Sequence, residues 1–313
     1  MTLLYADPCF LDHETGHHPE RAERLRVVFD RLRSMGLAAQ CSRPDFKPVD
    51  RRRLARVHSP AYIDEIWAFA KSGGGDIEAD TVVSPASYDV ALLAAGSVCD
   101  AVERVIRGED TTALCLVRPP GHHAITRHAM GFCLFNNVAV GAKLATDELG
   151  LDRVLIVDFD IHHGNGTQWT FWEDPRVGFF SVHRWPFYPG TGSADETGTG
   201  DGLGTTLNLP MEFGTPRKDY LSIYAGRLAE FAEKLKPQLV LVSAGFDSHR
   251  KDPVGNLGLE TEDFIPITNA ILDVAETYCG GRVVSTLEGG YNPQLLAECI
   301  ELHLDEVLKR GRK

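Results

Sequence analysis

The feature of this sequence that most restricts its fold is a series of short apolar runs, rich in β-branched residues, that alternate with helical patterns. Both faces of these runs are apolar, as is typical of strands covered by helices on both sides. The sequence therefore predicts an α/β protein built on a parallel sheet. The predicted strands are Thr112–Val117, Arg153–Asp158, Val177–Val182, Gln238–Ser243 and Arg282–Leu287.

Helical periodicity is clearest in Arg217–Lys236, where apolar residues recur every three or four positions and Pro237 ends the pattern. Because the 313 residues show no compositional break, we expect one domain over residues 1–313. The other predicted helices are Pro19–Met35, Pro60–Lys71, Pro85–Arg107, Asn136–Leu149, Thr261–Tyr278 and Pro293–Lys309.

The net charge of −12 argues against direct nucleic-acid binding, which requires a basic face. An acidic surface attracts cationic partners such as lysine-rich tails and polyamines, although many cytosolic proteins are equally acidic. The 7 cysteines form no CxxC pair, which is typical of reduced thiols in the cytoplasm. Without a signal-like start or an apolar run of about 18 residues, we expect a cytoplasmic protein that does not associate with membranes. The sequence leaves a homo-oligomer open.

Chemically active side chains follow four of the predicted strands. Ligands of parallel sheets bind beyond the carboxyl ends of the strands, so these side chains are expected to form one site. In chain order, the residues that follow the four strands are His122 and His123; Asp158, Asp160, His162 and Asn165; Asp247; and Tyr291.

A metal site is predicted from Asp160, His162 and Asp247. In an extended segment, the side chains of Asp160 and His162 point to the same side. With Asp247 they offer two carboxylates and one imidazole, which leaves a coordination position open, as catalytic zinc requires; Fe²⁺ or Mn²⁺ would also suit these ligands. The alternative is a polar pair with a structural role, but the histidines at an adjacent strand end favour a metal.

Acid–base chemistry is predicted for His122 and His123, with Asp158 and Asn165 as candidate orienting groups. A carboxylate partner keeps a histidine protonated to higher pH than an amide does, so the two pKa values should differ. Alternatively, both histidines are loop residues. Tyr291 follows two glycines and could donate its phenol to an oxyanion, or it could be a packed aromatic.

Together, these segments resemble the zinc-dependent histone deacetylase family, which includes bacterial deacetylase-like amidohydrolases and acetylpolyamine amidohydrolases. The resemblance covers nearly the whole chain and implies the arginase/deacetylase fold, a single domain with an eight-stranded parallel sheet between helices. The matching segments are HHPERAERL (17–25), RPPGHHA (118–124), GFCLFNN (131–137), DFDIHHGNGTQ (158–168), YPGTG (188–192), SAGFDSHRKDP (243–253) and LEGGY (287–291).

The resemblance implies a role for each matching residue. Asp160, His162 and Asp247 are the zinc ligands. His122 with Asp158 and His123 with Asn165 form the catalytic pair, and Tyr291 stabilises the oxyanion. The residues of the substrate tunnel are Asp80, Gly131, Phe132, Tyr188 and Val254. The implied ligands of structural K⁺ are Asp158, Asp160, His162, Ser181 and Val182 at one site, and Phe171, Asp174 and Val177 at a second.

The choice of substrate depends on smaller features. Asn165 resembles the class II branch. Polyamine-selecting relatives carry Glu at the gate where this chain has Val254, which favours acyl-lysine peptides or proteins over acetylated polyamines, the alternative substrates. The single carboxylate in Phe246–His249 argues against a two-metal arginase. A non-catalytic acyl-lysine reader is a further alternative, but the complete site argues against it. We interpret the glycine-rich segment Pro189–Gly204 as an active-site loop.

Overall fold

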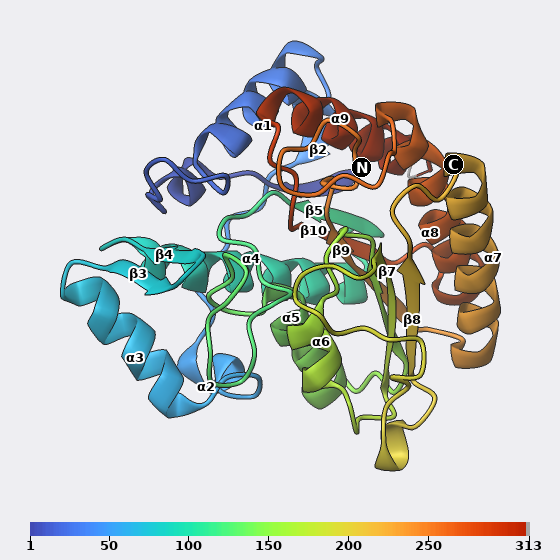
Figure 1. Cartoon of the computed structure of the whole chain (residues 1–313), viewed down its shortest axis with the longest axis horizontal. Helices are drawn as coiled ribbons and strands as arrows, with labels where there is room; N and C mark the ends of the chain where they lie inside the picture. The colour runs from blue at the N-terminus through green and yellow to red at the C-terminus, as the bar shows by residue number, and fades with distance from the viewer. Residues whose placement is uncertain (311–313) are drawn as a thin grey trace.

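A sheet of eight parallel strands forms the centre of the computed structural model, which describes residues 1–310 (Figure 1). Every neighbouring pair in it is parallel, which confirms the predicted fold class. In spatial order the strands are β2 (Cys41–Ser42), β1 (Thr2–Tyr5), β5 (Thr112–Cys115), β10 (Val283–Leu287), β9 (Leu239–Ala244), β6 (Val154–Asp158), β7 (Val177–Arg184) and β8 (Thr206–Met211).

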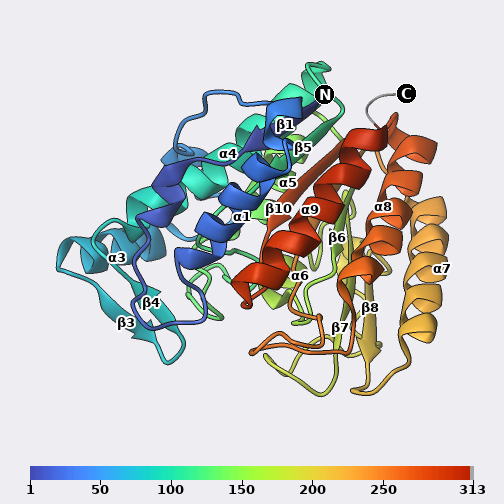
Figure 2. The same ribbon diagram turned by 90° about the horizontal axis from the view of Figure 1, so that it is seen from above.

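Helices cover both faces of the sheet (Figure 2). The helices α1, α9, α8 and α7 lie side by side on one face, whereas α4 and α5 pack together on the other. A separate hairpin, β3 (Gly75–Glu78) with β4 (Thr81–Val83), lies beside α3. The helices are α1 (Glu23–Ser34), α2 (Arg51–Leu54), α3 (Pro60–Lys71), α4 (Ser87–Arg107), α5 (Asn137–Asp147), α6 (Asn165–Thr170), α7 (Arg217–Leu235), α8 (Phe264–Cys279) and α9 (Pro293–Arg310).

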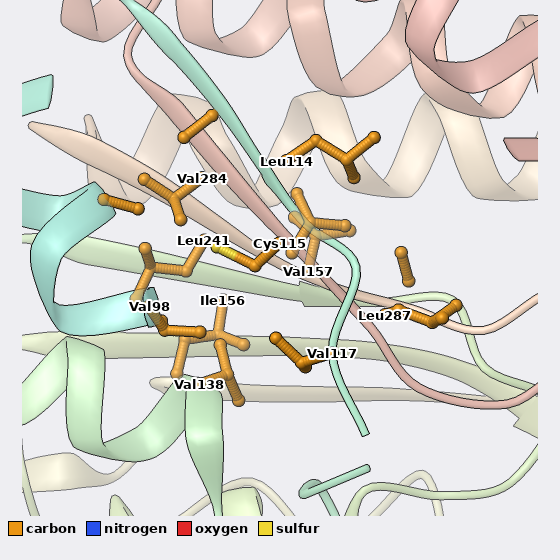
Figure 3. Close-up of a cluster of buried hydrophobic side chains, with 14 of the residues drawn as sticks. Val98, Leu114, Cys115, Val117, Val138, Ile156, Val157, Leu241, Val284 and Leu287 are labelled. Carbon is orange, nitrogen blue, oxygen red and sulfur yellow. The ribbon is translucent and has the colours of Figure 1, made fainter. Parts of the chain in front are cut away.

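The core between the sheet and α4 and α5 is aliphatic and fully buried. Val98 of α4 and Val138 of α5 pack near Ile156, Leu241 and Val284 of three neighbouring strands (Figure 3). Both faces of these strands are buried, which explains why their sequence is continuously apolar. No helix of the described chain is long and apolar enough to cross a membrane.

Several element boundaries differ from the predictions. The helix predicted from Pro19 begins only at Glu23, because the preceding residues form a loop that buries Glu20. Asn136 is not helical; its side chain caps α5 by accepting a hydrogen bond from the N–H of Ala139 at 3.0 Å. The strands β1 and β2 were not predicted, since runs of four and two residues carry too little pattern.

Candidate active site

The carboxyl ends of β5, β6, β9 and β10 bring the predicted side chains together. The strand β6 ends at Asp158, and the chain then bends instead of continuing in the extended form that we predicted. The bend allows Asp160 Oδ1 to accept a hydrogen bond from the backbone N–H of His162 at 2.9 Å, and it places His162 Nδ1 at the same distance from this oxygen. Asp160 and His162 therefore approach each other through a turn.

Asp160, His162 and Asp247 lie close enough together to share a cation. All three are buried, and one ligand atom of each lies within 4.8 Å of the others. His162 Nδ1 is 3.1 Å from Asp247 Oδ2, and that oxygen has no hydrogen-bond partner in the described chain. A buried carboxylate oxygen without a donor is costly, whereas a bound cation would satisfy it. The set fits a divalent metal with oxygen and nitrogen ligands.

Two glycines leave space for this arrangement. A Cβ at Gly245 would lie 2.0 Å from Asp160 Oδ2, and one at Gly289 would lie 2.2 Å from Asp247 Oδ2. The N–H of Gly289 donates to Asp160 Oδ2 at 2.8 Å. The carboxylates can therefore approach the backbone only because both positions lack a side chain.

The structure places each histidine of the pair beside the partner predicted for it. His122 Nδ1 is 2.9 Å from Asp158 Oδ2, His123 Nδ1 is 2.7 Å from Asn165 Oδ1, and the two rings are 4.0 Å apart. Burial alone would lower the pKa of His122, but the charges of Asp158 and Asp160 raise this pKa to about 10. Burial, with the charge of His122, holds the pKa of His123 well below its usual range. The two pKa values are separated as expected.

A cavity of about 260 Å³ leads to this cluster. Each residue predicted to bind substrate lines it, and so do His123, His162 and Tyr291; Phe187 is an addition that sequence reasoning missed. The lining residues are Asp80, His123, Gly131, Phe132, His162, Phe187, Tyr188, Val254 and Tyr291. A mainly apolar cavity that also exposes two histidines and a tyrosine hydroxyl suits a long aliphatic chain that ends in an amide.

Tyr291 is 7% exposed, and its ring packs edge-on against Phe132 at 5.5 Å. Its backbone N–H donates to Asp252 at 2.6 Å, which fixes the turn after the two glycines. Burial, together with the charge of Asp247, raises the pKa of the Tyr291 phenol well above its usual range. The hydroxyl therefore stays protonated and can donate a hydrogen bond.

Asp80 lies between the two strands of the hairpin and reaches the cavity from there. Its Oδ1 accepts from the N–H of Gly131 at 3.2 Å and from the hydroxyl of Thr81 at 2.7 Å. A Cβ at Gly131 would lie 2.3 Å from His123 Cδ2, so this position requires glycine. The hairpin thereby fixes the segment that carries Phe132.

Sequence reasoning assigned no role to Glu288, whose carboxylate binds the backbone of the turn that carries the histidine pair. It is buried, and its Oε2 accepts the N–H groups of Gly121 at 2.6 Å and of His122 at 3.2 Å. The LEGGY segment includes this residue, but the sequence alone does not indicate which N–H groups a carboxylate after a strand will bind.

Three further buried charges support the LEGGY turn. Arg24 donates to the carbonyl oxygens of Glu288 and Gly290, each at 2.6 Å, and to the Glu20 carboxylate at 3.0 Å. Arg118 binds the same carboxylate at 2.5 and 2.7 Å. The segment HHPERAERL thus supplies Glu20 and Arg24, whose function is to position the turn before Tyr291.

The residues expected to bind potassium form two groups. Ser181 is paired with Asp158 across β6 and β7, and its Oγ lies 2.9 Å from His183 Nδ1; Val182 follows it in β7. In the second group, the Asp174 carboxylate already binds Lys143 and Arg176, each at 2.8 Å. A cation at that turn would therefore depend on backbone carbonyl oxygens.

Comparison with known proteins identifies the family of this chain. The family described as "Histone deacetylase domain" matches residues 18–307. Human "Polyamine deacetylase HDAC10" is 40% identical over 92% of this chain and 44% of its own length. "Histone deacetylase-like amidohydrolase" of Pseudomonas aeruginosa is 36% identical over 90% of this chain and 73% of its own length. "Histone deacetylase 10, chloroplastic" of Oryza sativa subsp. japonica is 37% identical over 95% of this chain and 71% of its own length.

A solved structure of the HDA15 HD domain matches with a TM-score of 0.91 and 34% identity, over 98% of this chain and 91% of that one. The match extends the agreement from sequence to the arrangement of the whole sheet and its helices. This chain therefore belongs to the histone deacetylase family.

Proposed function

We propose that this deacetylase is zinc-dependent and hydrolyses the N-acetyl amide of lysine side chains, releasing acetate. The observation that carries the proposal is the buried set of Asp160, His162 and Asp247, of which His162 lines an apolar cavity. Family membership supports amide hydrolysis, and the unpartnered oxygen of Asp247 supports the metal.

The tunnel determines how the substrate would lie. Phe132 and Tyr188 would contact the aliphatic stem of the acetylated lysine, and Asp80 would accept a backbone N–H of the substrate. Phe187, which stacks on His162, would lie beside the acetyl group. The acetamide would then reach the metal ligands. Zinc bound there would supply a positive charge that polarises the amide carbonyl and makes water more acidic.

The different positions of the two histidines support different roles for them. His123 lines the cavity, whereas His122 lies behind it against Asp158. We assign to His123 the acceptance of the proton from the attacking water and its transfer to the leaving amine. His122, held by Asp158, would stabilise the negative charge that develops. The Tyr291 hydroxyl would donate to the oxyanion.

Acetylpolyamine deacetylation is the second candidate function. It is supported by the human relative whose name states that activity, at 40% identity. Val254 favours lysine, because an apolar gate offers no counter-charge to a distal ammonium group. A purely non-catalytic acyl-lysine reader would not need His123 and Tyr291 at the same cavity.

Several accompanying proposals concern ions and context. We propose that Fe²⁺ can replace zinc at the same ligands, and that K⁺ binds at the two groups around Ser181 and Phe171. We also propose a single catalytic domain over residues 1–313 that can form homo-oligomers. The cytoplasmic location stays a prediction, since a rice relative is named as chloroplastic.

A direct comparison of substrates tests the proposed function. Metal-free protein is loaded with one equivalent of Zn²⁺ or Fe²⁺ and assayed with an acetyl-lysine peptide and with N-acetylputrescine. We expect zinc-dependent hydrolysis with the higher kcat/KM on the peptide. A higher kcat/KM on N-acetylputrescine would contradict lysine deacetylation as the main activity and support the second candidate function. Hydrolysis of neither substrate would contradict both.

A further inference from the structure

Arg184, the last residue of β7, has an unusual environment for an arginine close to the cavity. Its guanidinium carbon lies 4.3 Å from the ring centroid of Phe187 and 4.6 Å from that of Phe213. Unlike Arg53 and Arg118, it forms no ion pair with a carboxylate of residues 1–310. Aromatic contacts rather than a counter-charge therefore hold this side chain.

The polar contact of Arg184 leads to the loop that carries Val254. Its Nη1 donates to the carbonyl oxygen of Asn256 at 3.3 Å. Asn256 has a φ of 83° and lies two residues after Val254, which lines the cavity. One guanidinium thus links the loop that carries Val254 to the aromatic ring of Phe187.

Phe187 is the part of the cavity wall that depends on this arginine. The ring lines the cavity and stacks on His162, with centroids 5.2 Å apart and planes inclined by 17°. The backbone N–H of Arg184 also donates to the carbonyl of Ile161 at 2.8 Å, between Asp160 and His162. Two contacts therefore fix the position of the Phe187 ring: stacking on His162 and the guanidinium of Arg184.

We propose that Arg184 is a positioning residue that holds Phe187 in place beside the metal-ligand candidate His162, and so determines which acyl groups the tunnel accepts. The inference rests on the proposed function, because it concerns the tunnel through which the acyl-lysine enters. Without the guanidinium, Phe187 keeps its contact with His162 but loses the contact with Arg184, and the Val254 loop loses a donor. The tunnel should then admit longer acyl groups.

The test compares wild-type protein with Arg184→Met and Arg184→Lys on one peptide that carries acetyl-, butyryl- or hexanoyl-lysine. In Arg184→Met, the ratio of kcat/KM for hexanoyl to that for acetyl should rise about three- to tenfold, as expected for the loss of a cation–π contact. The KM for the acetyl peptide should rise more than kcat falls, since Arg184 does not touch the reacting atoms. Arg184→Lys keeps the charge but not the planar stacking, so it should change the ratio in the same direction.

Two further variants separate positioning from general destabilisation. Arg227→Met removes an equally charged side chain from the outer surface of α7, where it is 48% exposed, and should leave the ratio unchanged. Phe213→Ala removes the outer ring, which is 62% exposed, so the fold should persist while the ratio shifts in the same direction as in Arg184→Met.

An unchanged ratio in Arg184→Met, even with a lower Tm, would overturn the inference and leave the proposed function intact. Wild-type selectivity in Arg184→Lys would overturn it as well, because charge alone would then be sufficient. If wild-type protein hydrolysed none of the three peptides, the proposed function would fail first, and the inference with it.

Discussion

The Tyr291 hydroxyl provides the sharpest test of how the site works. In Tyr291→Phe, the ring should keep its contacts with Phe132 at 5.5 Å and with the Arg24 guanidinium at 4.9 Å. The substitution therefore removes one hydrogen-bond donor and little packing. Loss of one oxyanion donor lowers kcat by about 10²–10³, or roughly 2.7–4 kcal/mol of transition-state stabilisation. We expect a loss of that size in kcat on an acetyl-lysine peptide, with KM changed little.

Tyr62→Phe is a matched control. The Tyr62 hydroxyl donates to the carbonyl of Leu134 at 2.7 Å and is also buried, but Tyr62 does not line the cavity. This variant should lose about 1 kcal/mol of unfolding free energy and retain kcat. The measurement is steady-state kinetics with zinc-loaded protein, together with urea unfolding of both variants. If kcat in Tyr291→Phe stayed within about twofold of wild type, the assigned role of the phenol would be refuted.

Two further predictions concern the gate and the buried charges. Val254→Glu should raise kcat/KM for N-acetylputrescine relative to the peptide, because a carboxylate would face the distal ammonium group; an unchanged ratio in competition assays would contradict this. Glu20→Gln should cost about 3–5 kcal/mol in urea unfolding at neutral pH, because Arg24 and Arg118 lose their buried counter-charge. Burial alone would raise the pKa of Glu20, but the charge of Arg118 lowers this pKa from 4.5 to about 2. The stabilisation by the ion pairs is therefore complete above pH 4.5 and is lost as the pH falls towards 2. The difference between wild type and variant should shrink over that range, and a constant difference would count against the ion pair.

Much of the fold could be predicted because the strands under both helix layers are continuously apolar. The predicted run at Arg153–Asp158 corresponds to β6 almost residue by residue. The parallel sheet alone was enough to predict that the active side chains gather at the carboxyl ends of the strands. This rule correctly predicted that Asp160 and Asp247 lie close together. The strands β1 and β2 escaped prediction because their burial depends on neighbours that are distant in sequence.

Other parts of the site could not be predicted for definite physical reasons. Asp160 and His162 approach through a bend that periodicity does not reveal. Phe187 lines the cavity because of its stacking on His162, which is a tertiary contact. The roles of Glu288 and Arg24 depend on burial and on backbone groups that only the folded chain brings near.

Zinc binding by Asp247 tests the central claim most directly. Calorimetric titration of metal-free protein with Zn²⁺ should show one site in wild type, and an affinity lowered by more than about 100-fold in Asp247→Asn, since even residues that only orient a metal ligand contribute 10- to 100-fold. The control Asp100→Asn loses a carboxylate that binds Tyr5 and Arg104 away from the site, and it should bind zinc normally. Equal zinc affinity in wild type and Asp247→Asn, with both folded by circular dichroism, would contradict the metal site on which the proposed reaction depends.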